Sequence, residues 1–298
     1  MKFSLIIPVA PDRTAPILNY IKNLDYSKEN YEFIVEYGTN ASENRNRGIQ
    51  KAKYDILCFL DDDAELPKDY LKNIEKFFKK NPEIDVVGGP QLTPKSDPFF
   101  AKVSGYILSS FLGTHKMSNR YKKGELNLDA DESYLTSANL IIKKSVFTKT
   151  HGYNTTIWPG EDPELICRLK RLGFKIAYSP EIIVYHKRRP TFKGFFKQFF
   201  NYGRNYVNYK KRILKERISL LHWMPSLFIL YLILLPLLYY NHIVFTIPFI
   251  LYLILVLIFS IHITISKKHY SAFPYLPFLF FAIHISYGLG LFRGLIKK

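Results

Sequence analysis

Cysteine is scarce in this sequence, which contains only Cys58 and Cys167. Two cysteines cannot make a disulfide framework, and these two lack the short spacing of a metal-binding pair. Cys58 lies in the apolar run 56–60, and Cys167 lies in a segment with helical periodicity. We therefore expect two buried, reduced thiols.

Acidic residues are also few, with 25 Asp and Glu against 42 Lys and Arg and a net charge of +17. Such a balance suggests an anionic partner: nucleic acid, acidic lipid or a phosphorylated substrate. Eleven basic residues lie between Lys187 and Arg217, where Glu216 is the only acid, and an apolar tail follows directly. A polybasic segment beside a membrane span indicates contact with lipid headgroups; a solvated helix face is the alternative. No recognised nucleic-acid motif accompanies the charge, so we predict no nucleic-acid partner.

The N-terminus lacks the features of a cleavable signal peptide. Its apolar run is short, is interrupted by Pro8, Pro11 and Asp12, and is not followed by a small-residue cleavage site. We expect this run to be the first strand of a cytosolic domain.

Strands and helices are expected to alternate along the first half of the chain. Apolar, β-rich runs occupy residues 3–9, 31–36, 55–60 and 84–88, and helical patterns fall between them, near 14–24, 43–53 and 68–79. This alternation predicts an α/β fold with a mostly parallel sheet covered on both faces. Later strands are expected at 135–142, 174–178 and 182–186. A helix is expected at 98–111 and a loop at 113–133.

Three apolar segments close the chain, near 219–240, 243–265 and 272–292. Each approaches the roughly 20 residues that a membrane-spanning helix needs. The first two have no charged residue between Ser219 and Ser266, and membrane helices tolerate the prolines they contain. The third carries prolines, His284 and two glycines, and two readings stay open: it spans the bilayer, or it re-enters and packs against the others.

These patterns predict three domains. They are a catalytic domain at 1–190, basic aromatic interfacial helices at 191–217, and a membrane domain at 218–298 with two or three transmembrane helices. Packing against the catalytic domain is the alternative role for the middle segment. Because basic loops stay inside, we expect a multi-pass protein of the cell (plasma) membrane with a cytosolic catalytic domain.

Three carboxylates, Asp61, Asp62 and Asp63, follow the apolar strand at 55–60. Ligands bind at the carboxyl ends of strands in open α/β sheets, and adjacent carboxylates favour a bound cation. Hard oxygen ligands suit Mg²⁺ or Mn²⁺, which would in turn hold a diphosphate. The alternative is a solvated acidic turn that caps the next helix.

Two further features carry chemistry. Glu161 and Asp162 open a helix after Gly160, so one of these carboxylates is a candidate general base for an acceptor hydroxyl; capping of the helix dipole is the alternative. His186 ends the apolar run 182–185. It is either a structural histidine or a third metal ligand.

The order of these features resembles family 2 glycosyltransferases of the GT-A fold, over about residues 2–210. The resemblance rests on six motifs: Ser4-Leu5-Ile6-Ile7-Pro8-Val9, Arg45-Asn46-Arg47-Gly48-Ile49, Asp61-Asp62-Asp63 as the DxD motif, Gly160-Glu161-Asp162, Tyr185-His186 and Tyr202-Gly203-Arg204. The C-terminal apolar segments look like those of membrane-bound members that build bacterial or archaeal surface polysaccharides.

The resemblance implies a nucleotide-sugar donor and a divalent metal, Mg²⁺ or Mn²⁺. It implies nucleotide-sugar binding by Pro8, Val9, Glu36, Arg45, Asp61 and Asp62. It implies metal binding by Asp63 and Asp61, with help from His186.

On the acceptor side, the resemblance implies that Asp162 is the catalytic base, with Glu161 beside it. Such enzymes invert the anomeric centre in a single displacement. We therefore expect a metal-dependent glycosyltransferase, of the hexosyl type, that acts on a lipid-linked or polysaccharide acceptor at the cytosolic face and contacts membrane lipids.

The sequence also departs from the family pattern. The family usually has Asp-Asp-Gly-Ser after the second strand, whereas this chain has Val35-Glu36-Tyr37-Gly38-Thr39, so Glu36 would replace the aspartate that reads the base. The departure leaves the nucleotide open and motivates an alternative, a catalytically degenerate membrane scaffold. A third reading is transfer to polyprenyl phosphate itself, which needs no strong base. The Gln-x-x-Arg-Trp motif of processive synthases is not evident.

Overall fold

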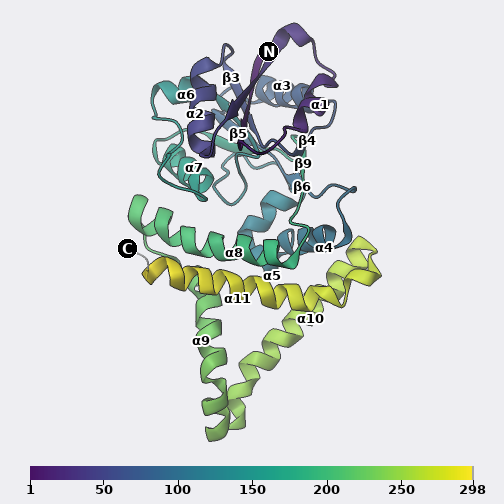
Figure 1. Ribbon diagram of the computed structural model, residues 1–298, viewed down its shortest axis with the longest axis vertical. Coiled ribbons are helices and arrows are strands. Elements are labelled where there is room, and N and C mark those ends of the chain that lie inside the picture. The colour runs from purple at the N-terminus through teal and green to yellow at the C-terminus, as the bar shows by residue number, and fades with distance from the viewer. Residues whose placement is uncertain (297–298) are drawn as a thin grey trace. The chain divides into compact units, whose positions relative to one another are not determined.

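The structure, a computed structural model, describes residues 1–296, so the last two positions of the predicted membrane domain, 297–298, lie outside the described residues. The chain forms two compact units (Figure 1). The first contains residues 1–96 and 116–187, and the second contains residues 97–115 and 188–298. The predicted boundaries after residues 190 and 217 stay a prediction.

A six-stranded sheet organises the first unit. Its strands, in spatial order, are β2 (Tyr31–Tyr37), β1 (Phe3–Val9), β3 (Ile56–Leu60), β7 (Asn139–Lys143), β5 (Val86–Gly88) and β8 (Ile176–Tyr178). Only β7 runs antiparallel to its neighbours among these six strands. The mixed, mostly parallel α/β sheet predicted from the sequence is confirmed.

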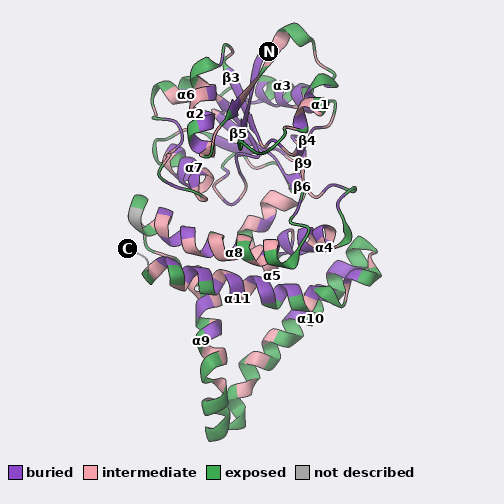
Figure 2. Cartoon of the chain, in the orientation of Figure 1, coloured by how far each residue is buried: buried purple, intermediate pink, exposed green. Residues whose placement is uncertain are grey.

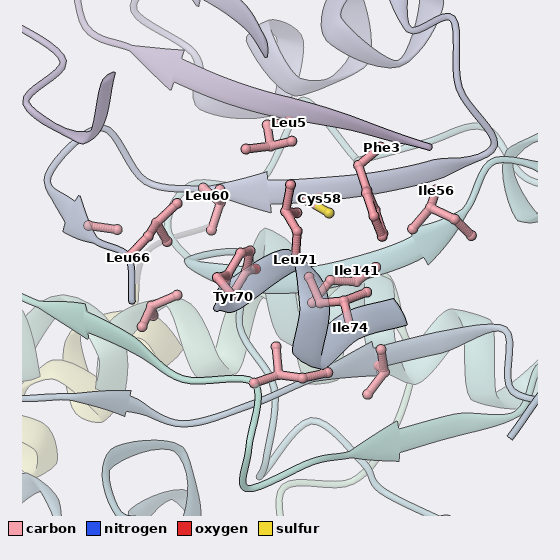
Figure 3. Close-up of a cluster of buried hydrophobic side chains, with 14 of the residues drawn as sticks. Phe3, Leu5, Ile56, Cys58, Leu60, Leu66, Tyr70, Leu71, Ile74 and Ile141 are labelled. Carbon is pink, nitrogen blue, oxygen red and sulfur yellow. The ribbon is translucent and has the colours of Figure 1, made fainter. Parts of the chain in front are cut away.

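Helices cover both faces of this sheet, whose central strands are buried along their whole length. Every residue of β1 and β3 is buried, and successive side chains of a strand point to opposite faces. Cys58 and Leu60 belong to one core cluster, with α3 (Tyr70–Lys80), as Figure 3 shows. Leu57 and Phe59 belong to the other, with α7 (Glu161–Arg171). The remaining helices of the unit are α1 (Ile17–Lys22), α2 (Ala41–Lys51), α6 (Ser145–Thr148), η1 (Lys28–Asn30) and η2 (His115–Tyr121).

A small second sheet contains β4 (Ala64–Glu65), β9 (Val184–His186) and β6 (Gln91–Leu92), in that order. Its register pairs Ala64 with His186. The pairing matters for the site, because Ala64 directly follows the three aspartates. Both cysteines are buried free thiols, as expected.

Two sequence expectations differ in detail from the structure. The strand expected at 135–142 begins only at Asn139, because the Thr136 hydroxyl bonds to the Ala138 N–H and the Gln91 amide. Such local hydrogen bonds compete with a sheet ladder. The loop expected at 113–133 contains the end of α5 (Phe111–Thr114) and all of η2.

The second unit is helical. Its main helices are α4 (Phe99–Leu108), α5, α8 (Phe192–Val207), α9 (Leu220–Asn241), α10 (Ile247–Lys267) and α11 (Tyr275–Ile296), with short helices η3 (Asn208–Ile213), η4 (Ile243–Thr246) and η5 (Tyr270–Ala272). The segments at 220–241, 243–267 and 275–296 are each long and apolar enough to cross a membrane, which confirms the three predicted apolar helices. Figure 2 shows α9 and α10 largely exposed and α11 largely covered.

Candidate active site

The three aspartates lie where β3 ends, in a turn that the Ala64 N–H closes onto the Asp61 carbonyl at 3.2 Å. The pairing of β4 with β9 brings His186 to the same place. Its Nε2 lies 3.2 Å from Asp61 Oδ2 and 3.2 Å from Asp63 Oδ1. Asp63 Oδ1 and His186 Nδ1 are buried and have no hydrogen-bond partner. The imidazole therefore stands between two carboxylates, with one ring nitrogen unsatisfied.

Arg45 connects these acids to the pair at the start of α7. It is 4% exposed. Its Nη2 donates to Asp61 Oδ1 at 3.2 Å, and its Nη1 donates to Glu161 Oε1 at 3.0 Å. The guanidinium carbon also lies 5.3 Å from the centre of the Tyr153 ring. Burial by itself raises the pKa of Asp61, but His186 and Arg45 outweigh it and hold that pKa at about 2.

Glu161 and Asp162 differ in how fully they are engaged. The chain enters α7 through Gly160 at φ 128°, a conformation that favours glycine. The Gly160 N–H donates to Glu161 Oε2 at 3.0 Å, and Arg45 holds the other oxygen. Asp162 Oδ1 lies 3.9 Å from Arg45 Nη1 and has no hydrogen-bond partner. One oxygen of Asp162 is therefore buried and unsatisfied.

The pKa of Glu161 is raised to about 7, by burial first and then by the adjacent Asp162 charge. The Arg45 ion pair acts in the opposite direction. The Asp162 charge thus disfavours ionisation of Glu161, and the Arg45 charge favours it.

Arg13 completes the site and was not predicted from the sequence. Its Nη2 lies 3.0 Å from Asp62 Oδ1 and 2.8 Å from Asp63 Oδ2. Burial, Asp63 and Asp61 raise the pKa of Asp62 to about 6, against the effect of Arg13. The sequence did contain a signal for Arg13. It is a basic residue just beyond β1, at the edge of a parallel sheet where ligands bind.

The predicted base-reading residues lie apart from this network. Pro8 and Val9 are buried within β1. Glu36 is 5% exposed and accepts hydrogen bonds from Arg47 Nε at 3.1 Å and Lys51 Nζ at 2.6 Å. Burial raises the pKa of Glu36, but the two cations lower it below its ordinary value. The nucleotide-binding roles of these three residues stay predictions.

The donor set suits a hard divalent cation. Carboxylate oxygens and an imidazole nitrogen are ligands that Mn²⁺ and Mg²⁺ accept, and the unbonded Asp63 Oδ1 points to a missing partner. Within residues 1–296, however, no three His, Cys, Asp or Glu side chains surround one point as metal ligands do. Instead Arg13 and Arg45 neutralise the acids, and His186 contacts Asp61 and Asp63. The residue types therefore fit a divalent cation, but in this structure Arg13 and Arg45 form ion pairs with the same acids.

Comparison with known proteins gives one family match, to residues 56–267, and the family is described as glycosyl transferase family group 2. The chain is 28% identical over 295 residues to a Methanococcus voltae protein named dolichyl N-acetyl-alpha-D-glucosaminyl phosphate 3-beta-D-2,3-diacetamido-2,3-dideoxy-beta-D-glucuronosyltransferase, covering 95% of this chain and 85% of that protein. It is 25% identical over 206 residues to the O-antigen chain rhamnosyltransferase RfbN of Salmonella typhimurium, covering 68% of this chain and 62% of that protein.

Solved structures with a similar course of the chain include S. aureus TarS residues 1–349, at 15% identity and a TM-score of 0.49 over 70% of this chain and 66% of that one. Another is the mannosyltransferase PcManGT from Pyrobaculum calidifontis, solved with GDP-Man and Mn²⁺, at 13% identity and a TM-score of 0.49 over 73% of this chain and 65% of that one.

Proposed function

Because the chain belongs to glycosyl transferase family group 2, we propose that it moves a sugar, with inversion, from a nucleotide-sugar to a lipid-linked or polysaccharide acceptor. The observation that carries this proposal is the network through Arg45, which links Asp61 after β3 to Glu161 and Asp162 on α7. The same network therefore contains residues that would bind the nucleotide-sugar donor and residues that would contact the acceptor.

On the donor side, Asp61, Asp63 and His186 would hold a divalent cation, and Arg13 and Arg45 would face the diphosphate. When bound, the cation offsets negative charge on the departing nucleoside diphosphate. The ion pairs support this role, because the two guanidiniums contact four carboxylates, those of Asp61, Asp62, Asp63 and Glu161. A diphosphate would add further negative charge, which calls for another cation.

On the acceptor side, Asp162 takes the proton of the acceptor hydroxyl as the oxygen attacks the anomeric carbon and the bond to the diphosphate breaks. Its Oδ1, free of hydrogen bonds, supports this role. Glu161 positions Arg45 and the start of α7 instead, because both of its oxygens already accept hydrogen bonds.

The long apolar helices support membrane association. We place the catalytic unit in the cytosol, on the side of the basic segment 187–217, in a multi-pass protein of the cell membrane. The name of the M. voltae relative, which aligns with nearly the whole chain, supports a lipid-linked saccharide acceptor.

Substitution of the proposed base, Asp162, or of a proposed metal ligand, Asp63, tests the assignment. We expect Asp162→Asn to lower the rate of transfer by about 10²–10⁴-fold, the usual contribution of a general base. We expect Asp63→Asn to weaken donor binding and the response to Mn²⁺. Asp129→Asn is a matched control, since that carboxylate is 91% exposed in a surface ion pair. Folded variants of Asp63 and Asp162 with wild-type turnover would refute these roles.

The donor and the acceptor class need a separate measurement. A panel of nucleotide-sugars, with and without Mn²⁺, is assayed for release of nucleoside diphosphate, and the lipid product is then analysed. A saccharide added to a lipid-linked sugar supports the proposal. A lipid monosaccharide phosphate instead identifies polyprenyl phosphate as acceptor, and no binding of UDP or GDP by calorimetry identifies a scaffold.

A further inference from the structure

The apolar helix α11 differs from α9 and α10 in how much of it the protein covers. Half of its most apolar 18-residue window is buried, against 11% in each of the other two. No residue is buried between Ile229, in the middle of α9, and Val256, in the middle of α10. Figure 1 shows α9 and α10 leaving α11 and converging at their far ends. The second unit thus contains one covered apolar helix and one projecting hairpin.

The main partner of α11 is α8, and the two helices run parallel with their backbones in contact. A Cβ on Gly290 would lie 2.0 Å from the Phe200 carbonyl oxygen, and one on Gly294 would lie 2.4 Å from the Arg204 carbonyl oxygen. Near the start of both helices, the rings of Phe192 and Phe278 lie 5.0 Å apart. Small residues allow this approach, and the contacts extend along nearly the whole of α8.

α8 is not a helix that can lie inside a bilayer. It carries Lys193, Lys197 and Arg204, and both lysines are exposed. Lys193 directly follows Phe192 and lies beside the start of α11, whereas Lys197 lies between the Phe192–Phe278 contact and the Phe200–Gly290 contact, beside the middle of α11. If α11 crossed the membrane, the charge of Lys197 would lie near the bilayer centre, where charged side chains are costly.

The uncovered face of α11 is apolar up to Arg293, which is exposed near the end of the helix. Its exposed large apolar side chains are Tyr275, Phe278, Phe281, Leu289 and Ile296, and they recur in steps that keep them on one side. A stripe of this kind beside a basic partner helix is typical of a helix that lies in the membrane interface. The lysines of α8 complement anionic lipid headgroups.

We propose that α11 lies along the surface of an anionic membrane, paired with α8, and that only α9 and α10 enter the bilayer. The two ends of the α9–α10 hairpin and the C-terminus then lie on one side of the membrane. This topology rests on the second unit alone and holds whether or not the chain transfers a sugar.

Accessibility in sealed vesicles of known orientation tests the topology. One variant carries Arg217→Cys, at an exposed position before α9, and another carries a cysteine appended after the last residue. Cys58 and Cys167 are buried, so the unchanged protein supplies the background for a membrane-impermeant maleimide. We expect both added thiols to react in the same vesicle orientation. Reaction in opposite orientations would show that α11 spans and would overturn the proposal.

Depth measurements give a second, independent readout. Nitroxides are placed by Phe278→Cys, Phe281→Cys and Leu289→Cys on the otherwise native protein, in vesicles of phosphatidylcholine with phosphatidylglycerol. We expect similar, shallow depths at all three sites, since a surface helix keeps one level. A steady change in depth from Phe278 to Leu289 would contradict the proposal.

Discussion

Arg45 joins two groups of acids that lie far apart in the sequence, since Glu161 follows it by 116 positions. Removing one partner of a buried ion pair lowers stability more than replacing both partners with apolar residues, because the remaining charge stays buried. The guanidinium of Arg45 is therefore structural as well as a candidate ligand for phosphate.

We expect Arg45→Met to lower the free energy of unfolding by about 3–5 kcal/mol. Lys123→Met is the control, because Lys123 and its partner Glu181 are 51% and 64% exposed and exposed ion pairs contribute at most about 1 kcal/mol. Denaturation of the detergent-solubilised protein measures both. Equal losses of stability in the two variants would contradict the bridging role of Arg45.

Glu36 offers a test through pH. Its folded-state pKa lies below the ordinary value, so its ion pairs stabilise the protein above the unfolded-state pKa of about 4.3 and lose that effect as the pH falls through the lower folded value. We expect Glu36→Gln to destabilise the protein by about 1–3 kcal/mol at pH 7.

The difference in stability between wild type and Glu36→Gln should shrink below about pH 4. Thermal unfolding at pH 7 and below pH 4 measures it. A constant difference would mean that Glu36 acts by packing alone. If the variant also keeps wild-type affinity for nucleoside diphosphates, the prediction that Glu36 reads the base is wrong.

Sequence reasoning located the acids of the site because their positions follow from the ends of apolar strands. Asp61 after β3 and His186 in β9 could be found this way. The contacts of Arg13 with Asp62 and Asp63 could not, because they depend on how the loop after β1 folds back. Arg45 was found, but its pairing with Glu161 depends on the packing of α2 and α7 and leaves no local pattern.

At the scale of elements, strands and helices followed from apolar periodicity, and each expected strand or helix range overlaps an observed element. Hydropathy reports how apolar a segment is and does not report what covers it. For that reason the sequence left the third apolar segment open between a span and a packed helix. The glycines of α11, not its hydropathy, carry the information about its contact with α8.

We expect Gly290→Val to separate α8 from α11, because its side chain would meet the backbone of Phe200. Overpacking of this kind costs about 1–3 kcal/mol or more. Gly124→Ala is the control, since its nearest neighbour, in the Tyr178 ring, lies at an ordinary 3.6 Å. Faster proteolysis of the second unit in Gly290→Val alone is the expected result, and wild-type resistance would contradict it.

At the scale of the whole molecule, two kinds of membrane contact act together: the apolar hairpin and the basic, partly apolar α8–α11 pair. They differ in physical character. Apolar insertion is insensitive to salt, whereas attraction of lysines to anionic headgroups is screened over about 8–10 Å at physiological ionic strength. Salt therefore separates their contributions.

A variant with residues 230–255 replaced by a flexible linker tests this division, because the replaced segment contains no buried residue. We expect the variant to float with anionic vesicles at low salt and to dissociate at high salt, while the full chain stays bound. Salt-resistant binding by the variant would mean that the hairpin is not the anchor.

The order of synthesis determines when α8 and α11 can pair. α8 leaves the ribosome well before α11, with α9 and α10 between them. Until α11 arrives, the surface of α8 that includes Phe200 and Gly203 lacks its later cover. The nascent chain must keep α8 on the lipid surface while the hairpin inserts. It must then release α11 from the insertion machinery, although α11 is apolar enough to be retained.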